Sequence, residues 1–229
     1  MIRLVRVLAG GTALALALGV VIVAWVGPPI GSRTRGASTP ETVGDYGPVP
    51  NFSLMDRSGR RITLADLKGK VWLANFIYTR CTETCPLQSA EIARLQEEFA
   101  EARDLRFVSI TVDPEHDTPA VLNAYATRYH ADPAQWLFLT GSKSAIYALA
   151  KDGFKLGVTD AGTTRAETGG RLVGPTPAFA SHGSKGLIMH SARFVLVDRK
   201  GRIRAYHRSD DPDSLADIGK NLRALLAES

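Results

Sequence analysis

The sequence predicts an α/β fold in which a central mixed sheet is flanked by helices. Apolar runs of strand length alternate with helical patterns in the order β-α-β-α-β-α, and this alternation favours a mostly parallel sheet. The runs from Arg193 to Asp198 and from Arg202 to Tyr206 surround a Lys200-Gly201 turn, which predicts an added hairpin. Of the 229 residues, 45% are hydrophobic and 22% are charged, so the chain can bury one ordinary globular core.

The central strand is predicted from Val71 to Tyr78, an apolar stretch rich in β-branched and aromatic residues. It ends in a polar turn that holds both cysteines of the protein, Cys81 and Cys85. Pro86 follows, and a helical pattern of apolar residues continues as far as Phe99. The sequence therefore places two thiols between a buried strand and the start of a helix.

The remaining elements follow from local patterns. Residues 52–64 alternate around a Ser58-Gly59 turn, which predicts an N-terminal hairpin. Two further strands are expected at 105–112 and 136–140, and helices are expected at 118–129, with an N-cap threonine and a first-turn proline, at 142–151, and at 213–227. Between residues 157 and 187 the pattern gives way to Gly, Thr, Ser and Pro, which predicts a loop insertion.

Residues 1–27 are predicted to be a membrane anchor. Arg3 and Arg6 precede an uncharged run at 7–26, which as a helix would span about 30 Å, the thickness of a bilayer's hydrocarbon core. A cleaved signal sequence is the alternative, although the small-x-small cleavage pattern is poorly matched. The cationic start predicts a cytoplasmic N-terminus, and so a single-pass protein of the cell inner membrane whose globular domain lies on the periplasmic side.

The rest of the chain divides into a linker and one domain. Residues 28–45 are rich in Gly, Ser, Thr and Pro, as is typical of a flexible linker, and residues 46–229 form the predicted domain. The net charge of +5 belongs mainly to the N-terminal flank, because residues 1–35 hold four arginines and no acidic residue, which leaves 24 basic against 23 acidic residues. No basic stripe is interleaved with aromatic residues, so nucleic-acid binding is not expected.

The cysteine pair points to redox or metal chemistry. Two cysteines are too few for a disulfide framework, and a bridge between Cys81 and Cys85 would close only a very short loop. Thiols four positions apart at a helix start lie on one face, with Cα atoms about 6 Å apart, and the helix N-terminus favours the thiolate. The pair therefore predicts a reversible dithiol or a site for a soft metal, Cu(I) or Zn(II). A pair of buried structural cysteines is less favoured, because both lie in a polar turn.

A third ligand would distinguish a metal site from a bare redox pair, and the five histidines are the candidates. His116 follows the second long strand, His130 is expected to end a helix, His207 is expected to be solvated, and His182 lies in the insertion. His190 stands just before a strand that should run beside the central one, which would bring it towards the thiols.

Three pieces of the sequence together resemble the Sco/SenC family of copper-handling proteins. They occur in the family's order and cover about residues 46–229: FIYTRCTETCP at 76–86, VDPEHDTP at 112–119, and His190-Ser191 ahead of VLVD at 195–198. The resemblance implies a thioredoxin-like fold, and it implies that Cys81, Cys85 and His190 hold copper. It also implies a role in assembling the Cu-A centre of cytochrome c oxidase.

Two features depart from the family's pattern. The segment from Gly157 to Leu187 is longer than expected, and His116 stands where a different polar residue, often arginine, is expected. Asp113 and Asp117 are expected near the same sheet edge as the thiols, either as groups that orient the ligands or as ordinary turn and cap residues.

Two functions follow from these features. The first is a membrane-anchored copper metallochaperone that receives copper from an upstream donor and delivers it to the oxidase subunit carrying the Cu-A site. It would bind Cu(I), and Cu(II) as well if the histidine takes part. The alternative is an enzyme, a thiol–disulfide oxidoreductase in which Cys81, expected to be the more exposed thiol, attacks a partner's cysteine pair and Cys85 resolves the mixed disulfide.

Overall fold

The computed structural model describes residues 43–156 and 192–228, and the predicted mixed sheet lies within them. Seven strands form one sheet in the order β2-β1-β5-β4-β3-β6-β7. The three inner strands run parallel to one another: β3 (Val71–Ile77), β4 (Leu105–Thr111) and β5 (Trp136–Thr140). The outer strands pair antiparallel: β1 (Ser53–Asp56), β2 (Arg61–Thr63), β6 (Arg193–Val197) and β7 (Ile203–Arg208).

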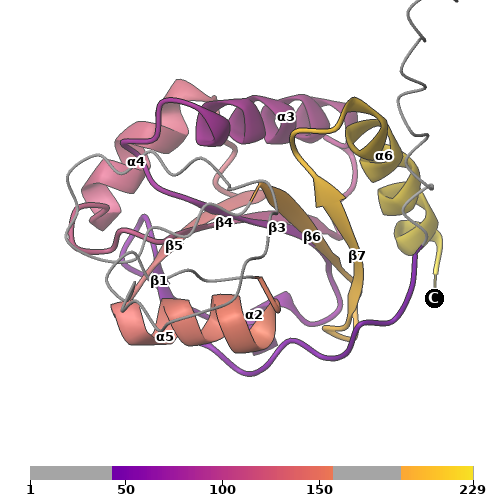
Figure 1. Cartoon of the computed structure of the whole chain (residues 1–229), viewed down its shortest axis with the longest axis horizontal. Helices are drawn as coiled ribbons and strands as arrows, with labels where there is room; N and C mark the ends of the chain where they lie inside the picture. The colour runs from indigo at the N-terminus through magenta and orange to yellow at the C-terminus, as the bar shows by residue number, and fades with distance from the viewer. Residues whose placement is uncertain (1–42, 157–191, 229) are drawn as a thin grey trace, which may run out of the picture. The chain divides into compact units, whose positions relative to one another are not determined.

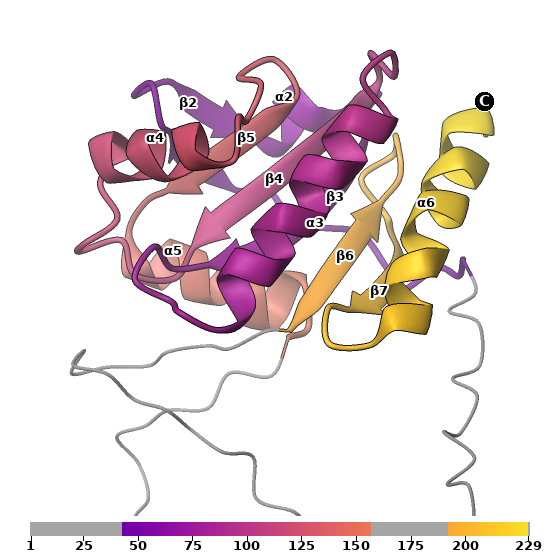
Figure 2. The ribbon, with the colours of Figure 1, turned by 90° about the horizontal axis from the view of Figure 1, so that it is seen from above.

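Helices cover both faces of the sheet (Figure 1). One face carries α3 (Thr84–Glu98), α4 (Pro119–Arg128) and α6 (Pro212–Ala227). The other face carries α2 (Leu64–Leu67) and α5 (Lys143–Ala148), which continues into a π-helical turn, η1 (Leu149–Gly153). Figure 2 shows α3 and α6 side by side over the part of the sheet that contains β3, β6 and β7.

The inner position of β3 in the sheet follows from its composition. All seven of its residues are buried, as expected for a strand covered on both faces. Its neighbours on the two sides are β4 and β6, so the strand predicted from the sequence lies inside the sheet, next to the middle strand β4.

The predicted helix starts are confirmed by their caps. The Thr118 hydroxyl accepts a hydrogen bond from the Val121 N–H at 3.4 Å, and Pro119 is the first helical residue of α4. The Ser142 hydroxyl accepts from the Ala145 N–H at 3.3 Å at the start of α5. The short α2 was not predicted.

Two apolar cores lie on the two faces of β3. The α5-face core includes Trp72, Phe76, Val108, Phe154 and Val195. The α3-face core includes Leu73, Ile77, Ile92, Phe107 and Leu222. Because side chains alternate along a strand, neighbouring residues of β3 contribute to different cores.

The outer edge of β7 is covered by the segment 44–49. The Gly44 N–H donates to the Arg204 carbonyl at 2.7 Å, the Ile203 N–H donates to the Gly47 carbonyl at 2.9 Å, and the Val49 N–H donates to the Gly201 carbonyl at 2.9 Å. Main-chain pairing therefore continues beyond the last named strand of the sheet.

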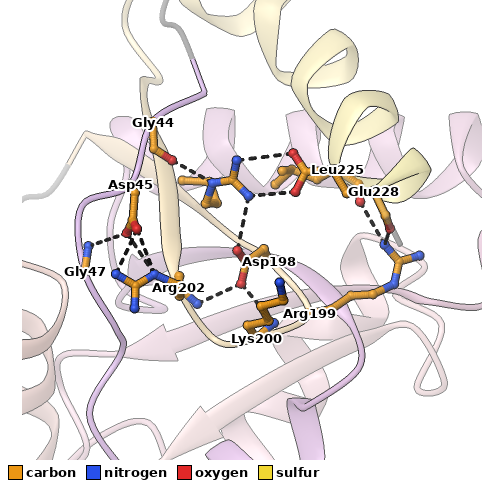
Figure 3. A network of polar contacts seen from close by, with 10 residues as sticks. Gly44, Asp45, Gly47, Asp198, Arg199, Lys200, Arg202, Leu225 and Glu228 are labelled. Carbon is orange, nitrogen blue, oxygen red and sulfur yellow. Dashed lines mark hydrogen bonds and ion pairs between the residues drawn. The ribbon is translucent and has the colours of Figure 1, made fainter.

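Charged side chains fasten the same region (Figure 3). The Arg204 guanidinium donates to the Gly44 carbonyl at 2.6 Å and forms ion pairs with Asp198 at 3.2 Å and Glu228 at 2.7 Å. The guanidinium of Arg202 pairs with Asp45 at 2.8 Å. The first described residues, β7 and the end of α6 are thus held together.

No helix among the described residues is long and apolar enough to cross a membrane. The predicted anchor at residues 1–27 lies outside these residues, as do the insertion and the candidate ligands His182 and His190.

Candidate thiol and metal centre

The two cysteines lie together at the junction of β3 and α3. The Cys81 N–H donates to the Tyr78 carbonyl at 3.1 Å, which closes a turn directly after the strand. Cys85 is the second residue of α3, and its N–H donates to the Cys81 sulfur at 3.4 Å. Both thiols are free. The helix begins at Thr84, so it includes Cys85, whereas the sequence pattern placed its start near Pro86.

Both thiols are more buried than a polar turn suggested. Cys81 is 7% exposed and Cys85 is 5% exposed, and both join the α3-face core. Cys81 was expected to be the more exposed thiol, and its exposure differs very little from that of Cys85. A difference in reactivity has to come from the hydrogen bonds around each sulfur.

Those hydrogen bonds favour a thiolate at Cys81. The Cys85 thiol donates to the Cys81 sulfur, and the backbone N–H groups of Cys85 and Glu83 also donate to it, which lowers the pKa of Cys81 to about 4 against the cost of burial. The same hydrogen bond and burial raise the pKa of Cys85, so that it keeps its proton. The helix start therefore stabilises one thiolate, as its N–H groups predict, and the pair shares one proton at neutral pH.

The cysteine loop is fastened to the end of β4 by Asp117. This carboxylate is fully buried and accepts hydrogen bonds from the Thr79 N–H at 3.0 Å, the Thr79 hydroxyl at 2.5 Å and the Thr111 hydroxyl at 2.5 Å. A second contact nearby is the ion pair of Arg80 with Asp113 at 2.7 Å. The two aspartates thus lie at the same sheet edge as the thiols and hold the loop that carries Cys81.

Asp113, His116 and Asp117 also form a compact group in which one ligand atom from each lies within 4.8 Å of the others. The His116 Nδ1 lies 2.9 Å from an Asp117 oxygen. Both Asp117 oxygens already accept short hydrogen bonds from threonine hydroxyls, so the group is explained by its role in supporting the loop.

The strand that follows His190 lies where the sequence predicted. β6 pairs antiparallel with β3, in the register Ala74 with Val195, so β6 begins at the edge of the sheet where β3 ends. The first described residue after the insertion, Ala192, accepts a hydrogen bond from the Ser209 N–H at 2.8 Å. The position of His190 itself lies outside the described residues.

The expectation that His207 is solvated was wrong. His207 is a fully buried residue of β7, and its ring nitrogens lie 3.1 Å from the Ser214 carbonyl and 3.4 Å from the Asn221 amide nitrogen. The hairpin strand continues to Arg208, so alternation turns His207 towards α6. His130 follows the end of α4, as expected, in a left-handed conformation with φ of 50°.

Three buried polar residues on the thiol-bearing face of the sheet were not expected from the sequence: Asn75 of β3, Ser109 of β4 and Gln88 of α3. The signal was present for the first two, since each stands within an apolar run, VWLANFI for Asn75 and FVSI for Ser109. Gln88 stands three positions after Cys85 and so lies on the same side of the helix.

The fold and this site define a thioredoxin-like α/β protein with two free cysteines at a strand–helix junction. The chain belongs to the SCO1/SenC family, whose sequence profile matches residues 42–226. The family resemblance noted in the sequence is thereby confirmed.

Individual relatives agree with this assignment. The SCO1 protein homolog of Bacillus subtilis (strain 168) is 41% identical over 109 residues, which are 47% of this chain and 56% of the relative's length. The match thus spans little more than half of that relative. A Stutzerimonas stutzeri protein named for copper binding is 31% identical over 163 residues, covering 70% of this chain and 69% of its own.

Solved structures share the fold. A SCO1/SenC family lipoprotein from Bacillus anthracis str. Ames superposes with a TM-score of 0.62 at 28% identity, covering 80% of this chain and 99% of its own. The structure of BsSco, described as a member of the Sco family of cytochrome c oxidase assembly proteins with a disulfide switch, gives a TM-score of 0.60 at 26% identity, covering 82% of this chain and 98% of its own.

Proposed function

We propose that this protein is a copper metallochaperone that binds copper through Cys81, Cys85 and His190 and delivers it to the Cu-A site of a cytochrome c oxidase subunit. The observation that carries the proposal is the close approach of the two cysteines at the start of α3, where the Cys85 backbone N–H donates to the Cys81 sulfur at 3.4 Å and the Cys85 thiol donates to the same sulfur.

Two adjacent thiols suit Cu(I) for chemical reasons. Thiolate is a soft ligand, and Cys81 is held ready as a thiolate because its pKa is lowered to about 4 by the Cys85 thiol and the backbone donors. Cys85 releases its proton when copper binds, so the metal replaces the proton that the two sulfurs share. A site with only two sulfurs and one histidine leaves room for an incoming thiolate, which allows copper to arrive from a donor and leave to an acceptor by ligand exchange.

His190 is the proposed third ligand. It stands two residues before Ala192, where the chain enters β6 at the thiol edge of the sheet. An imidazole nitrogen would also allow the site to accept Cu(II). Support comes from the relative in Stutzerimonas stutzeri that is named for copper binding, and the acceptor is suggested by the description of BsSco as an oxidase assembly protein.

The proposed location is the cell inner membrane, with residues 1–27 as an uncleaved anchor and the domain on the periplasmic side. The support is the uncharged run at 7–26 behind two arginines. Membrane fractionation with alkaline extraction, combined with the mass of the mature chain, tests it. A mature protein found in the soluble fraction and shortened by about 25 residues would contradict the anchor.

A second function, thiol–disulfide exchange, is favoured by the unequal pKa values of the two cysteines. The Cys81 thiolate would attack one sulfur of a partner's disulfide, forming a mixed disulfide and releasing one partner thiolate. Cys85, once deprotonated, would then attack the Cys81 sulfur and release the second partner thiolate. The partner gains two electrons, and this protein is left with a Cys81–Cys85 disulfide. The same sulfurs serve both functions.

One set of variants separates these functions. Copper stoichiometry and disulfide-reductase activity are measured for the full chain and for Cys81→Ser, Cys85→Ser and His190→Ala, with His130→Asn as the control histidine because asparagine tolerates a left-handed backbone. We expect both cysteine variants to lose copper and reductase activity, and His190→Ala to bind copper more weakly while it still reduces disulfides.

The outcomes are distinct. Unchanged copper affinity in His190→Ala would contradict the three-ligand site. Copper binding that survives both cysteine substitutions would contradict the proposed function itself. The control should match the wild-type chain in both assays.

A further inference from the structure

A chain of hydrogen bonds crosses the α3-face core, which also contains both cysteines. The Trp136 indole donates to the Ser109 hydroxyl at 3.0 Å, and that hydroxyl donates to the Asn75 side-chain oxygen at 2.7 Å. The Asn75 amide donates to the Gln88 side-chain oxygen at 3.1 Å, and the Gln88 amide donates to the Ser209 hydroxyl at 3.1 Å. The first four side chains are fully or almost fully buried.

The hydrogen bonds of this chain run in one direction from the indole. An indole N–H can only donate, so the Ser109 hydroxyl accepts from it, and the Ser109 proton goes to the Asn75 side-chain oxygen. The Asn75 amide nitrogen donates to the Gln88 side-chain oxygen, and the Gln88 amide nitrogen donates to the Ser209 hydroxyl.

This chain connects the two parts of the fold that approach the thiol edge. Gln88 lies one helical turn after Cys85, and Asn75 lies two residues before the end of β3. At the other end, the Ser209 N–H donates to the Ala192 carbonyl at 2.8 Å, just before β6 begins. Gln88 therefore links the first turns of α3 both to β3 and to the segment that leads into β6.

A second contact holds the same part of the helix from another side. The Tyr125 hydroxyl lies 2.9 Å from the Ser89 hydroxyl and donates to the Cys85 carbonyl at 3.4 Å. The Cys85 backbone is thus held by α4, while Gln88 holds the following turn to the sheet. Apolar packing alone would resist a rotation or a slide of this helix less specifically than directed hydrogen bonds do.

We propose that Gln88 is a positioning residue of the copper centre, and that its side-chain amide fixes the depth and rotation of the helical turn that carries Cys85. The proposal rests on the function proposed above, in which Cys81 and Cys85 bind copper. Low-coordinate Cu(I) requires two sulfurs at a defined separation, and contacts outside the ligand set are what hold ligands in place.

The test compares Gln88→Leu with Gln96→Leu in the full chain. Leucine fills a similar volume but makes no hydrogen bond. Gln96 lies two turns further along α3, and its hydrogen bonds to described residues go to the loop after α4, through the His130 carbonyl at 3.2 Å and the Asp132 N–H at 2.9 Å, so it is the matched control. Cu(I) affinity is measured by competition with a chromogenic chelator, and the sulfur-to-copper absorption and electron paramagnetic resonance spectra of the Cu(II) form are recorded.

Gln88→Leu should still bind about one copper ion per chain, with an affinity lower by about tenfold and altered copper–sulfur spectra. The control should keep the wild-type affinity and spectra. Ser209→Ala, which removes only the last acceptor, should change the spectra in the same direction by a smaller amount, and it keeps the proposal testable if Gln88→Leu does not fold.

Wild-type affinity and spectra in a folded Gln88→Leu protein would overturn the positioning role and leave the proposed function intact. A loss of affinity with unchanged spectra, in proportion to the unfolded fraction, would also overturn it. Copper binding that is equally tight in Cys85→Ser and in the wild-type protein would instead overturn the proposed function.

Discussion

The two faces of β3 use the same strand for different purposes. On the α5 face, aromatic side chains pack against one another, with Phe154 meeting Trp72 and Phe76 at ring-centroid distances of 5.9 and 5.5 Å. Two polar atoms on this face, the Trp72 indole nitrogen and the Tyr206 hydroxyl, have no hydrogen-bond partner among the described residues. On the α3 face, the polar atoms of Asn75 and Gln88 are joined in one directed chain.

The difference between the two faces shows where buried polar groups in this core have hydrogen-bond partners. Burying an amide without a partner is unfavourable, and burying it with partners adds direction that apolar contacts lack. The α3 face carries the thiols, so directed contacts there have a use. The α5 face has to provide cohesion, and aromatic packing is enough for that.

The largest expected effect tests the α5 face. Phe154→Ala should lower the free energy of unfolding by about 3–5 kcal/mol, because a fully buried aromatic side chain is replaced by a cavity. Urea unfolding measures this loss. Copper stoichiometry of the folded protein should not change, and a loss of copper binding under folding conditions would break the contrast between the faces.

The next prediction concerns the thiols. Because the pKa of Cys81 is lowered to about 4, the protein should show about one thiolate per chain at pH 7, where an ordinary thiol would be only a few per cent ionised. A pKa lowered on folding stabilises the fold fully above the unfolded value of about 8.5, and this contribution is lost as the pH falls towards 4. Ultraviolet thiolate absorbance, followed during an acid titration, measures the ionised fraction of Cys81 at each pH.

The Cys85→Ser variant sharpens that titration. It replaces the thiol that donates to the Cys81 sulfur, so the midpoint should move to a different pH while the backbone donors remain. A wild-type midpoint near pH 8.5 would mean that the helix start does not stabilise the Cys81 thiolate.

A smaller effect is expected at the support of the cysteine loop. Asp117→Asn should lower the free energy of unfolding by about 2 kcal/mol, because the amide NH2 group that replaces one carboxylate oxygen cannot accept the hydrogen bonds that Thr79 or Thr111 donates to that position. Chemical denaturation gives the stability. If the loop depends on this residue, copper affinity should fall as well, and an unchanged affinity would show that Asp117 serves the fold alone.

The smallest effect is expected at the neighbouring ion pair. Asp113→Asn removes the ion pair with Arg80, whose side chain is 48% exposed, so the unfolding midpoint should stay within experimental error. This variant is the matched control for Asp117→Asn, since both replace an aspartate in the same loop. A large loss of stability here would mean that the ion pair, and not the buried carboxylate, fastens the loop.

Much of the fold was predictable because it depends on local signals. Apolar runs located β3, β4 and β5, and the hydroxyls of Thr118 and Ser142 located two helix starts. The burial of His207 was missed because it depends on which face of β7 meets α6, and that is decided by packing between distant segments.

The candidate site was predictable in part. Spacing alone brought Cys81 and Cys85 together, whereas the opposite shifts of their pKa values depend on which sulfur receives the backbone donors. Gln88 was passed over because its partners, Asn75 and Ser209, lie 13 and 121 positions away in the sequence. The roles of His190 and of the N-terminal anchor stay predictions.

The segment that covers β7 limits how a partner can meet this protein. An exposed edge strand can accept a further strand from another chain, which is a common mode of recognition and a common route to aggregation. Here the β7 edge already pairs with residues 44–49, through bonds such as Ile203 N–H to the Gly47 carbonyl at 2.9 Å. Strand addition at β7 is thereby blocked, so a partner strand that joins the described sheet would have to pair with β2, the edge strand at the other end.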